Sequence, residues 1–255
     1  MLIKHTIKGF ILCMACLLLS QVAWASQPHS AVPAGKYTSL KTVSGQWFNV
    51  YTSGPENSKK GILLIHGWWG LNEEVERWAD QFGIAGYCVM AVDLYNSKVT
   101  TNPAEAKQLM NGVNQSEANE KYMSTIKALS APGRKIAVIG RSYGANQALH
   151  AALVGQETIS ATIIYYPYGN LISDQKELSL IKTPILGQFA RYDFFLTPDK
   201  LEHFISTVNK SGLDMTVNIY EAKHGFDNPA GKNFSQPAQK LAHDRTNQFL
   251  DKYLH

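Results

Sequence analysis

The sequence Gly-Arg-Ser-Tyr-Gly at residues 140–144 is the feature that most constrains how this chain can fold. It follows an apolar run, residues 135–139, and precedes a helix-forming run, residues 145–153. A strand that leads through G-x-S-x-G into a helix holds the serine on a sharp turn, with its hydroxyl pointing out of the sheet. The turn brings the flanking chain close together, and only residues without bulk, here Gly140 and Gly144, fit there. The pattern predicts that Ser142 is a nucleophile at the end of a strand.

The rest of the chain alternates between apolar runs and segments with helical periodicity. Such alternation predicts an α/β fold with a mostly parallel sheet that is covered by helices on both faces. Near-continuous apolar runs, such as residues 62–65, are typical of strands buried on both sides. The expected strands lie in residues 48–51, 61–65, 87–92, 135–139, 161–165, 184–189 and 215–220, and the expected helices in residues 73–84, 117–129, 201–209 and 238–253. No repeat, low-complexity segment or shift in composition marks a second domain.

The N-terminus predicts a secretory signal peptide, residues 1–25. Two lysines precede an apolar run, residues 10–19, and Ala23-Trp24-Ala25 fits the small-x-small cleavage rule. The apolar run is short for a membrane span, which disfavours an uncleaved anchor. Cys16 leaves a lipoprotein open as a less favoured alternative. We therefore expect an exported protein, periplasmic or secreted, with a single domain over residues 26–255 and no stable membrane insertion after cleavage.

Cleavage would also change the cysteine and charge counts. Two of the three cysteines lie in the leader, so the mature chain keeps only Cys88, which excludes an intramolecular disulfide. Cys88 lies in an apolar run and is expected to be a buried strand residue. Loss of Lys4 and Lys8 leaves 22 basic and 20 acidic residues. No basic run is present, so the sequence gives no support for nucleic-acid binding.

A serine on such a turn needs a histidine base and an acid that orients it, in the chain order serine, acid, histidine. His224 lies just after the expected strand 215–220, where the base should be. Asp193 follows the expected strand 184–189 and is the preferred acid. Asp199 is the alternative, but its place at the start of a helix is explained by the helix dipole. The remaining histidines after Ser142 lie in helical segments or at the C-terminus.

An oxyanion in the reaction needs two backbone N–H donors. Tyr143, directly after the serine, should supply one, and Trp68, in the loop His-Gly-Trp-Trp-Gly at residues 66–70, should supply the other. His66 is expected to support this loop rather than to act in catalysis. Trp68 and Trp69 are expected to wall a substrate pocket, and a role as ordinary core aromatics stays open.

These motifs together resemble the dienelactone hydrolase family of α/β-hydrolases. The resemblance covers nearly all of the mature chain and includes residues 66–72, 85–87, 92–95, 102–106 and 223–226 besides the serine turn. It implies a sheet of about eight strands, a site at their carboxyl ends, a triad of Ser142, Asp193 and His224, and an oxyanion site at Trp68 and Tyr143. The best-studied members have a cysteine at the position of Ser142 and a glutamate at that of Gly67. The chain thus resembles a serine variant of the family.

The sequence as a whole predicts an exported serine hydrolase that cleaves small carboxylic esters or lactones through an acyl-enzyme at Ser142. No metal or organic cofactor is expected, and the oligomeric state is left open. A thioester or peptide hydrolase with the same triad is one alternative. A non-catalytic binding protein on a hydrolase fold is another, and the intact set of Ser142, Asp193 and His224 argues against it.

Overall fold

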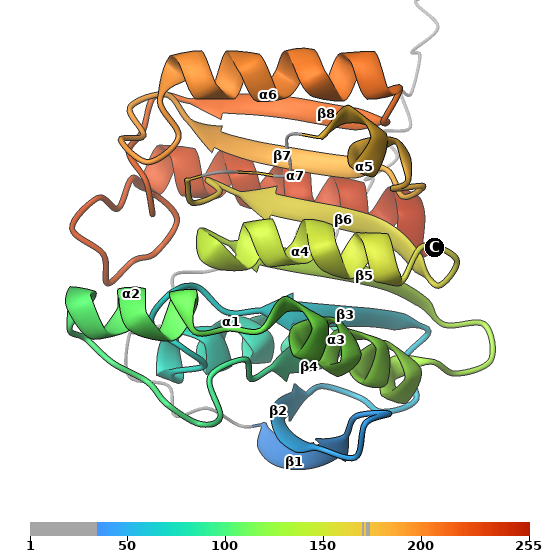
Figure 1. Cartoon of the computed structure of the whole chain (residues 1–255). Coiled ribbons are helices and arrows are strands. Elements are labelled where there is room, and N and C mark those ends of the chain that lie inside the picture. Colours follow the sequence, from blue (N-terminus) through green and yellow to red (C-terminus); the bar gives the residue numbers. More distant parts are fainter. Residues whose placement is uncertain (1–34, 170, 172–173) are drawn as a thin grey trace, which may run out of the picture. The chain divides into compact units, whose positions relative to one another are not determined.

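The computed structural model describes residues 35–255 except 170, 172 and 173, and its centre is a single twisted sheet (Figure 1). The predicted signal peptide lies outside the described residues. The strand order is β1-β2-β4-β3-β5-β6-β7-β8. The strands are β1 (Lys36–Lys41), β2 (Trp47–Ser53), β3 (Lys60–Ile65), β4 (Cys88–Val92), β5 (Lys135–Arg141), β6 (Ile159–Tyr165), β7 (Ile185–Ala190) and β8 (Met215–Tyr220).

The sheet is largely parallel, as the sequence predicted. β2 pairs antiparallel with both β1 and β4, whereas every other pair of neighbouring strands is parallel. The central strand β3 is buried on both faces, and the side chains of Ile62, Leu63, Leu64 and Ile65 have no exposed surface. This burial explains why the strand is a continuous apolar run rather than an alternating one.

Helices cover both faces of the sheet. α1 and α7 lie behind it in Figure 1, and α3, α4 and α6 lie in front, where they share one hydrophobic core. In α1 the side chain of Asn72 accepts a hydrogen bond from the N–H of Val75 and so caps the helix. The helices are α1 (Glu73–Ile84), α2 (Pro103–Asn111), α3 (Gln115–Leu129), α4 (Tyr143–Val154), α5 (Gln175–Ser179), α6 (Pro198–Ser211) and α7 (Gln236–Leu254). The described residues include no helix that is both long and apolar enough to cross a membrane.

Three elements were absent from the sequence prediction. β1 is an edge strand whose residues are nearly all exposed, so it has no apolar run. α2 buries only Ala106 and therefore lacks an apolar stripe, although Asn102 caps it and Pro103 opens it. α5 has only five residues. Such elements follow from capping and edge pairing rather than from hydrophobic periodicity.

The parallel strands direct their carboxyl ends, and the loops that follow them, to one edge of the sheet. Ile65, the last residue of β3, is paired with Gly140 in β5, and Ala190, the last residue of β7, is paired with Tyr220 of β8. Loops after these four strands therefore meet, as expected for ligand sites in open α/β sheets.

Candidate active site

The turn between β5 and α4 holds Ser142 in a strained backbone conformation. Its φ and ψ are 54° and −120°, a region that non-glycine residues rarely adopt. The turn is tight, because a Cβ atom added to Gly140 would lie 1.9 Å from the carbonyl oxygen of Gly144. Two backbone hydrogen bonds anchor the turn, from the Ser142 N–H to Tyr165 and from the Tyr168 N–H to Ser142. The local sequence thus fixes the serine at the start of α4.

A chain of two hydrogen bonds joins Ser142 to His224 and Asp193. Ser142 Oγ lies 2.8 Å from His224 Nε2, and His224 Nδ1 lies 2.7 Å from Asp193 Oδ2. The other oxygen of Asp193 accepts hydrogen bonds from the N–H groups of Phe195 and Leu196, so the carboxylate is fixed in orientation. Asp193 is buried. The three side chains that the sequence pattern grouped therefore meet at one point.

The loop after β3 lies beside the serine and is held by His66. The N–H of Leu94 donates to His66 Nε2, so the ring proton resides on Nδ1, which lies 2.6 Å from the carbonyl oxygen of Gly67. Burial lowers the pKa of His66 and favours this neutral form. In a planar trans peptide the N–H points opposite to the carbonyl, so the N–H of Trp68 points away from His66.

The peptide that carries the N–H of Trp68 lies beside Ser142. A Cβ on Gly67 would lie 4.0 Å from the Cβ of Ser142, so the peptide is adjacent to the serine. In the described part of the chain, no acceptor engages the N–H of Trp68 or of Tyr143. Both N–H groups are therefore uncommitted and lie close to Ser142.

Aromatic rings surround His224 on one side of the serine. We call Trp68, Tyr168, Phe194 and Phe195 the aromatic shelf. Phe195 is its centre, with its ring 4.8 Å from that of His224 and 4.5 Å from that of Tyr168. Phe194 is two-thirds exposed, so the shelf opens to solvent. It offers an apolar surface beside His224.

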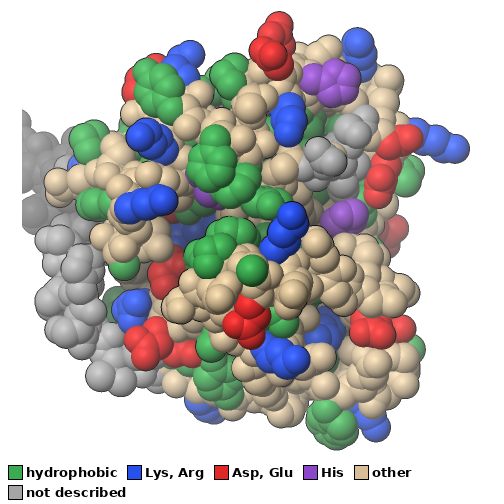
Figure 2. All heavy atoms as spheres, turned by 60° about the vertical axis from the view of Figure 1, so that its left-hand side comes forward, with side chains coloured by type: hydrophobic (Ala, Val, Ile, Leu, Met, Phe, Trp, Pro, Cys, Tyr) green, Lys and Arg blue, Asp and Glu red, His purple; other side chains and the backbone are tan. Residues whose placement is uncertain are grey.

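A cavity of about 410 Å³ opens beside Ser142 and His224, and Trp68 of the aromatic shelf also lines it. Figure 2 shows this face of the molecule, with hydrophobic side chains around a hollow and charged side chains within it. Both Trp68 and Trp69, which the sequence placed in a substrate pocket, contribute to the wall of this cavity. The remaining wall comes from the end of β3 and its loop, from α1, from the serine turn, from Tyr166 and from the loop after β8. Its side chains include Glu74, Val75, Trp78, Arg141, His224, Asn228, Lys232 and Asn233.

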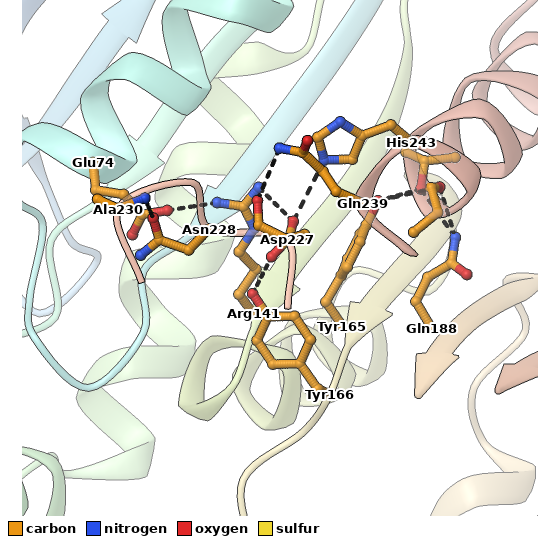
Figure 3. Close-up of polar contacts among 12 residues, drawn as sticks. Glu74, Arg141, Tyr165, Tyr166, Gln188, Asp227, Asn228, Ala230, Gln239 and His243 are labelled. Carbon is orange, nitrogen blue, oxygen red and sulfur yellow. Dashed lines mark hydrogen bonds and ion pairs between the residues drawn. The ribbon is translucent and has the colours of Figure 1, made fainter. Parts of the chain in front are cut away.

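A buried ionic cluster lies beneath this cavity (Figure 3). The guanidinium of Arg141 binds Glu74 through Nη1 and Asp227 through Nη2, each at 2.7 Å. It also stacks on Trp78, with its carbon 3.4 Å from the ring centre. Burial raises the pKa of Glu74, although Arg141 opposes the shift. Burial also acts to raise the pKa of Asp227, but Arg141, His243 and Tyr166 together hold it below its usual value.

Two residues with weaker claims to a catalytic role occupy ordinary structural positions. Asp199 lies in the first turn of α6 and Cys88 is buried at the start of β4. The sequence interpretation missed Glu74 and Asp227. Nothing in their local pattern distinguishes them from surface carboxylates, since the partner Arg141 is far away in the chain. Among the described residues, no three histidine, cysteine or acidic side chains are grouped as a metal site requires.

Comparison with known proteins identifies the family. Residues 48–254 match the model of the dienelactone hydrolase family. The chain is 26% identical over 218 residues to the protein usf of Aquifex pyrophilus, covering 80% of this chain and 93% of that protein. It is 25% identical over 203 residues to a putative carboxymethylenebutenolidase of Aquifex aeolicus, covering 73% of this chain and 85% of that protein.

Solved structures agree on the fold. A putative dienelactone hydrolase from Klebsiella pneumoniae superposes with a TM-score of 0.75 at 15% identity, covering 86% of this chain and all of that one. A second structure, named m3DLH, gives a TM-score of 0.76 at 16% identity over 87% of this chain and all of that one. The chain therefore belongs to the dienelactone hydrolase family of α/β-hydrolases and is a carboxylic ester hydrolase.

Proposed function

We propose that the protein is a serine hydrolase that cleaves small carboxylic esters or lactones through an acyl-enzyme at Ser142. The observation that carries the proposal is the pair of hydrogen bonds from Ser142 Oγ to His224 and from His224 to Asp193. In this scheme His224 Nε2 takes the hydroxyl proton as Oγ attacks the ester carbonyl, and then gives it to the leaving alcohol. Water, activated by the same histidine, releases the acid.

Two further features support this mechanism. The N–H groups of Trp68 and Tyr143, which lie close to Ser142 and make no other backbone hydrogen bond among the described residues, would stabilise the carbonyl oxygen as it becomes negative. Asp193, anchored by two backbone N–H groups, keeps a proton on His224 Nδ1, which leaves Nε2 free to accept the serine proton. None of these steps requires a metal ion or an organic cofactor.

The aromatic shelf and the cavity suit different parts of a substrate. The aromatic shelf suits an apolar group, whereas the cavity presents Glu74, Arg141 and two asparagines to a group with hydrogen-bonding atoms. We therefore expect esters or lactones with one apolar and one polar side.

Labelling with a fluorophosphonate probe tests the nucleophile. The probe should modify the purified protein at Ser142 and at no other residue. Ser142→Ala should abolish both labelling and hydrolysis of p-nitrophenyl acetate, with a loss of about 10⁴-fold or more in rate, and should still fold. Cys88→Ser is the matched control, because Cys88 is buried in β4 and should leave the rate unchanged. Retention of more than about a tenth of the activity by Ser142→Ala would refute the proposal.

A substrate panel tests the bond type. Matched esters, thioesters and amides with the same acyl group should rank with the esters first. Preference for the thioester or the amide would favour the alternative hydrolases, and failure to turn over any of them would favour a binding protein.

We also propose that the protein is exported after cleavage between Ala25 and Ser26. The support is the sequence alone, namely the short apolar run followed by alanines at the two sites that the peptidase reads. N-terminal sequencing of protein from the periplasmic or culture fraction should begin at Ser26. Recovery of an intact Met1 would overturn this proposal.

A further inference from the structure

Asp227 is a buried carboxylate beneath the site that the reaction proposed above does not use. It has no exposed surface and lies three residues after His224 in the chain. Figure 3 shows it at the centre of the cluster, between Arg141 of β5, Tyr166 and His243 of α7. Burying a charge is costly unless it is paired, so this carboxylate requires a physical reason for its retention.

Asp227 is connected to Ser142 through Arg141 and to His224 through Tyr166. Arg141, whose Nη2 lies 2.7 Å from Asp227 Oδ2, is the residue directly before Ser142. The hydroxyl of Tyr166 donates to Asp227 Oδ1, and the ring of Tyr166 packs edge-on against the His224 imidazole at 4.9 Å. One carboxylate thus binds the neighbour of the nucleophile and the ring that supports the base.

We propose that Asp227 is a positioning residue, which holds Ser142 and His224 at reacting distance through its ion pair with Arg141 and its hydrogen bond from Tyr166. The proposal rests on the function proposed above, because it concerns the geometry of the same serine and histidine. A misplacement of about 1 Å can cost about 100-fold in rate even when it originates away from the reacting atoms.

Arginine is the cation suited to this position. Its planar guanidinium reaches Asp227 with one nitrogen and Glu74 with another, while its face stacks on Trp78. The serine turn, the loop of the base and α1 are therefore joined by one rigid group. A lysine could keep the charge but could not make the same pair of contacts.

An exposed ion pair on the same loops offers a matched comparison. Glu221 lies three residues before His224 and pairs with Arg191, two residues before Asp193. The side chains of Glu221 and Arg191 are at least half exposed, so solvent screens this ion pair. The pair should therefore contribute little to the stability or the geometry of these loops. Glu221 and Asp227 are each three residues from His224 in the chain, but Glu221 is exposed and Asp227 is buried.

The test is the rate of Ser142 modification in Asp227→Asn, which removes the charge and keeps the shape. The fluorophosphonate probe gives the maximal inactivation rate, kinact, and the binding constant, KI, and prolonged labelling counts the folded sites. We expect kinact per labelled site to fall about 10- to 100-fold with KI nearly unchanged, because Asp227 does not line the cavity. Glu221→Gln should keep the wild-type kinact.

Substitutions of the two partners of Asp227 keep the proposal testable if Asp227→Asn does not fold. Tyr166→Phe, which loses one hydrogen bond and keeps the ring, should lower kinact by less than Asp227→Asn. Arg141→Lys should retain more rate than Arg141→Met, because it keeps the charge.

A purely structural role predicts fewer labelled sites or a lower melting temperature with an unchanged kinact per site, and this result would overturn the proposal. An equal loss in Glu221→Gln would overturn it as well. Failure of the function itself is distinguishable, since the wild-type protein would then not be labelled at Ser142.

Discussion

The contact between Gly140 and Gly144 makes Gly140→Ala a sharp test of the tight serine turn. A real Cβ atom essentially never approaches another heavy atom closer than 3.0 Å, whereas a Cβ on Gly140 would lie 1.9 Å from the Gly144 oxygen and 2.3 Å from its carbon. Both atoms belong to the backbone, so no side-chain rotation can relieve the clash. The turn must therefore open by about 1.1 Å or more.

This opening should affect both stability and rate. Forcing an extra methyl group into a packed site costs about 1–3 kcal/mol, which lowers the melting temperature by about 2–4 °C per kcal/mol in a domain of this size. A displacement of this size at the nucleophile should lower kcat/KM by about 100-fold. The loss of rate should therefore exceed what partial unfolding at the assay temperature can explain.

Gly67→Ala provides the control for folding. Its added Cβ would meet the carbonyl oxygen of Arg141 at 3.7 Å and the Cβ of Ser142 at 4.0 Å, which are ordinary contacts, so its melting temperature should match the wild type. Thermal melts and p-nitrophenyl acetate kinetics of both variants, measured together, decide the matter. The reasoning is refuted if Gly140→Ala melts within about 2 °C of wild type and keeps its kcat/KM within about threefold.

Three further outcomes can be measured. Asp193→Asn should lower kcat by about 10⁴-fold, because the asparagine oxygen would stay bonded to two backbone N–H groups and the asparagine NH₂ group would then face His224. Asp199→Asn should have little effect, and a larger loss at Asp199 than at Asp193 would identify Asp199 as the acid. Leu64→Ala should lower the free energy of unfolding by about 2–5 kcal/mol, since Leu64 is fully buried in β3. Denaturant unfolding measures this, and an unchanged midpoint would contradict it. Burial lowers the pKa of His66 and His150, so the folded state binds fewer protons than the unfolded chain and stability should fall as the pH drops below about 6.5; a melting temperature that is constant from pH 7 to pH 5 would argue against it.

The sequence predicted the sheet and the helices where local chemistry was sufficient. Continuous apolar runs identified β3 to β8, and helical periodicity identified α1, α3, α6 and α7. Their order also predicted which loops meet at the carboxyl edge of the sheet, and this is why Ser142, Asp193 and His224 could be grouped from the sequence alone. Each of the three follows a strand whose own pattern is clear.

The ionic cluster could not be predicted in the same way. Glu74, Arg141 and Asp227 come from three distant segments, and each one alone looks like a solvated charge. Their pairing depends on how α1 and the loop after β8 pack over the serine turn. This packing belongs to the tertiary structure and cannot be read from any local sequence pattern. β1 was missed for a related reason, because it is stabilised by hydrogen-bonded pairing with β2 and not by burial of an apolar face.

The segment from residue 228 to residue 234 forms one wall of the cavity as a single excursion between β8 and α7. It is tied down near its ends, where Asn233 donates to the His224 carbonyl and the N–H of Ser235 donates to Phe226. The sheet, the serine turn and Asp227 all lie outside it. Exchange of this one contiguous stretch should therefore change the shape of the cavity while Ser142, His224 and Asp193 stay in place.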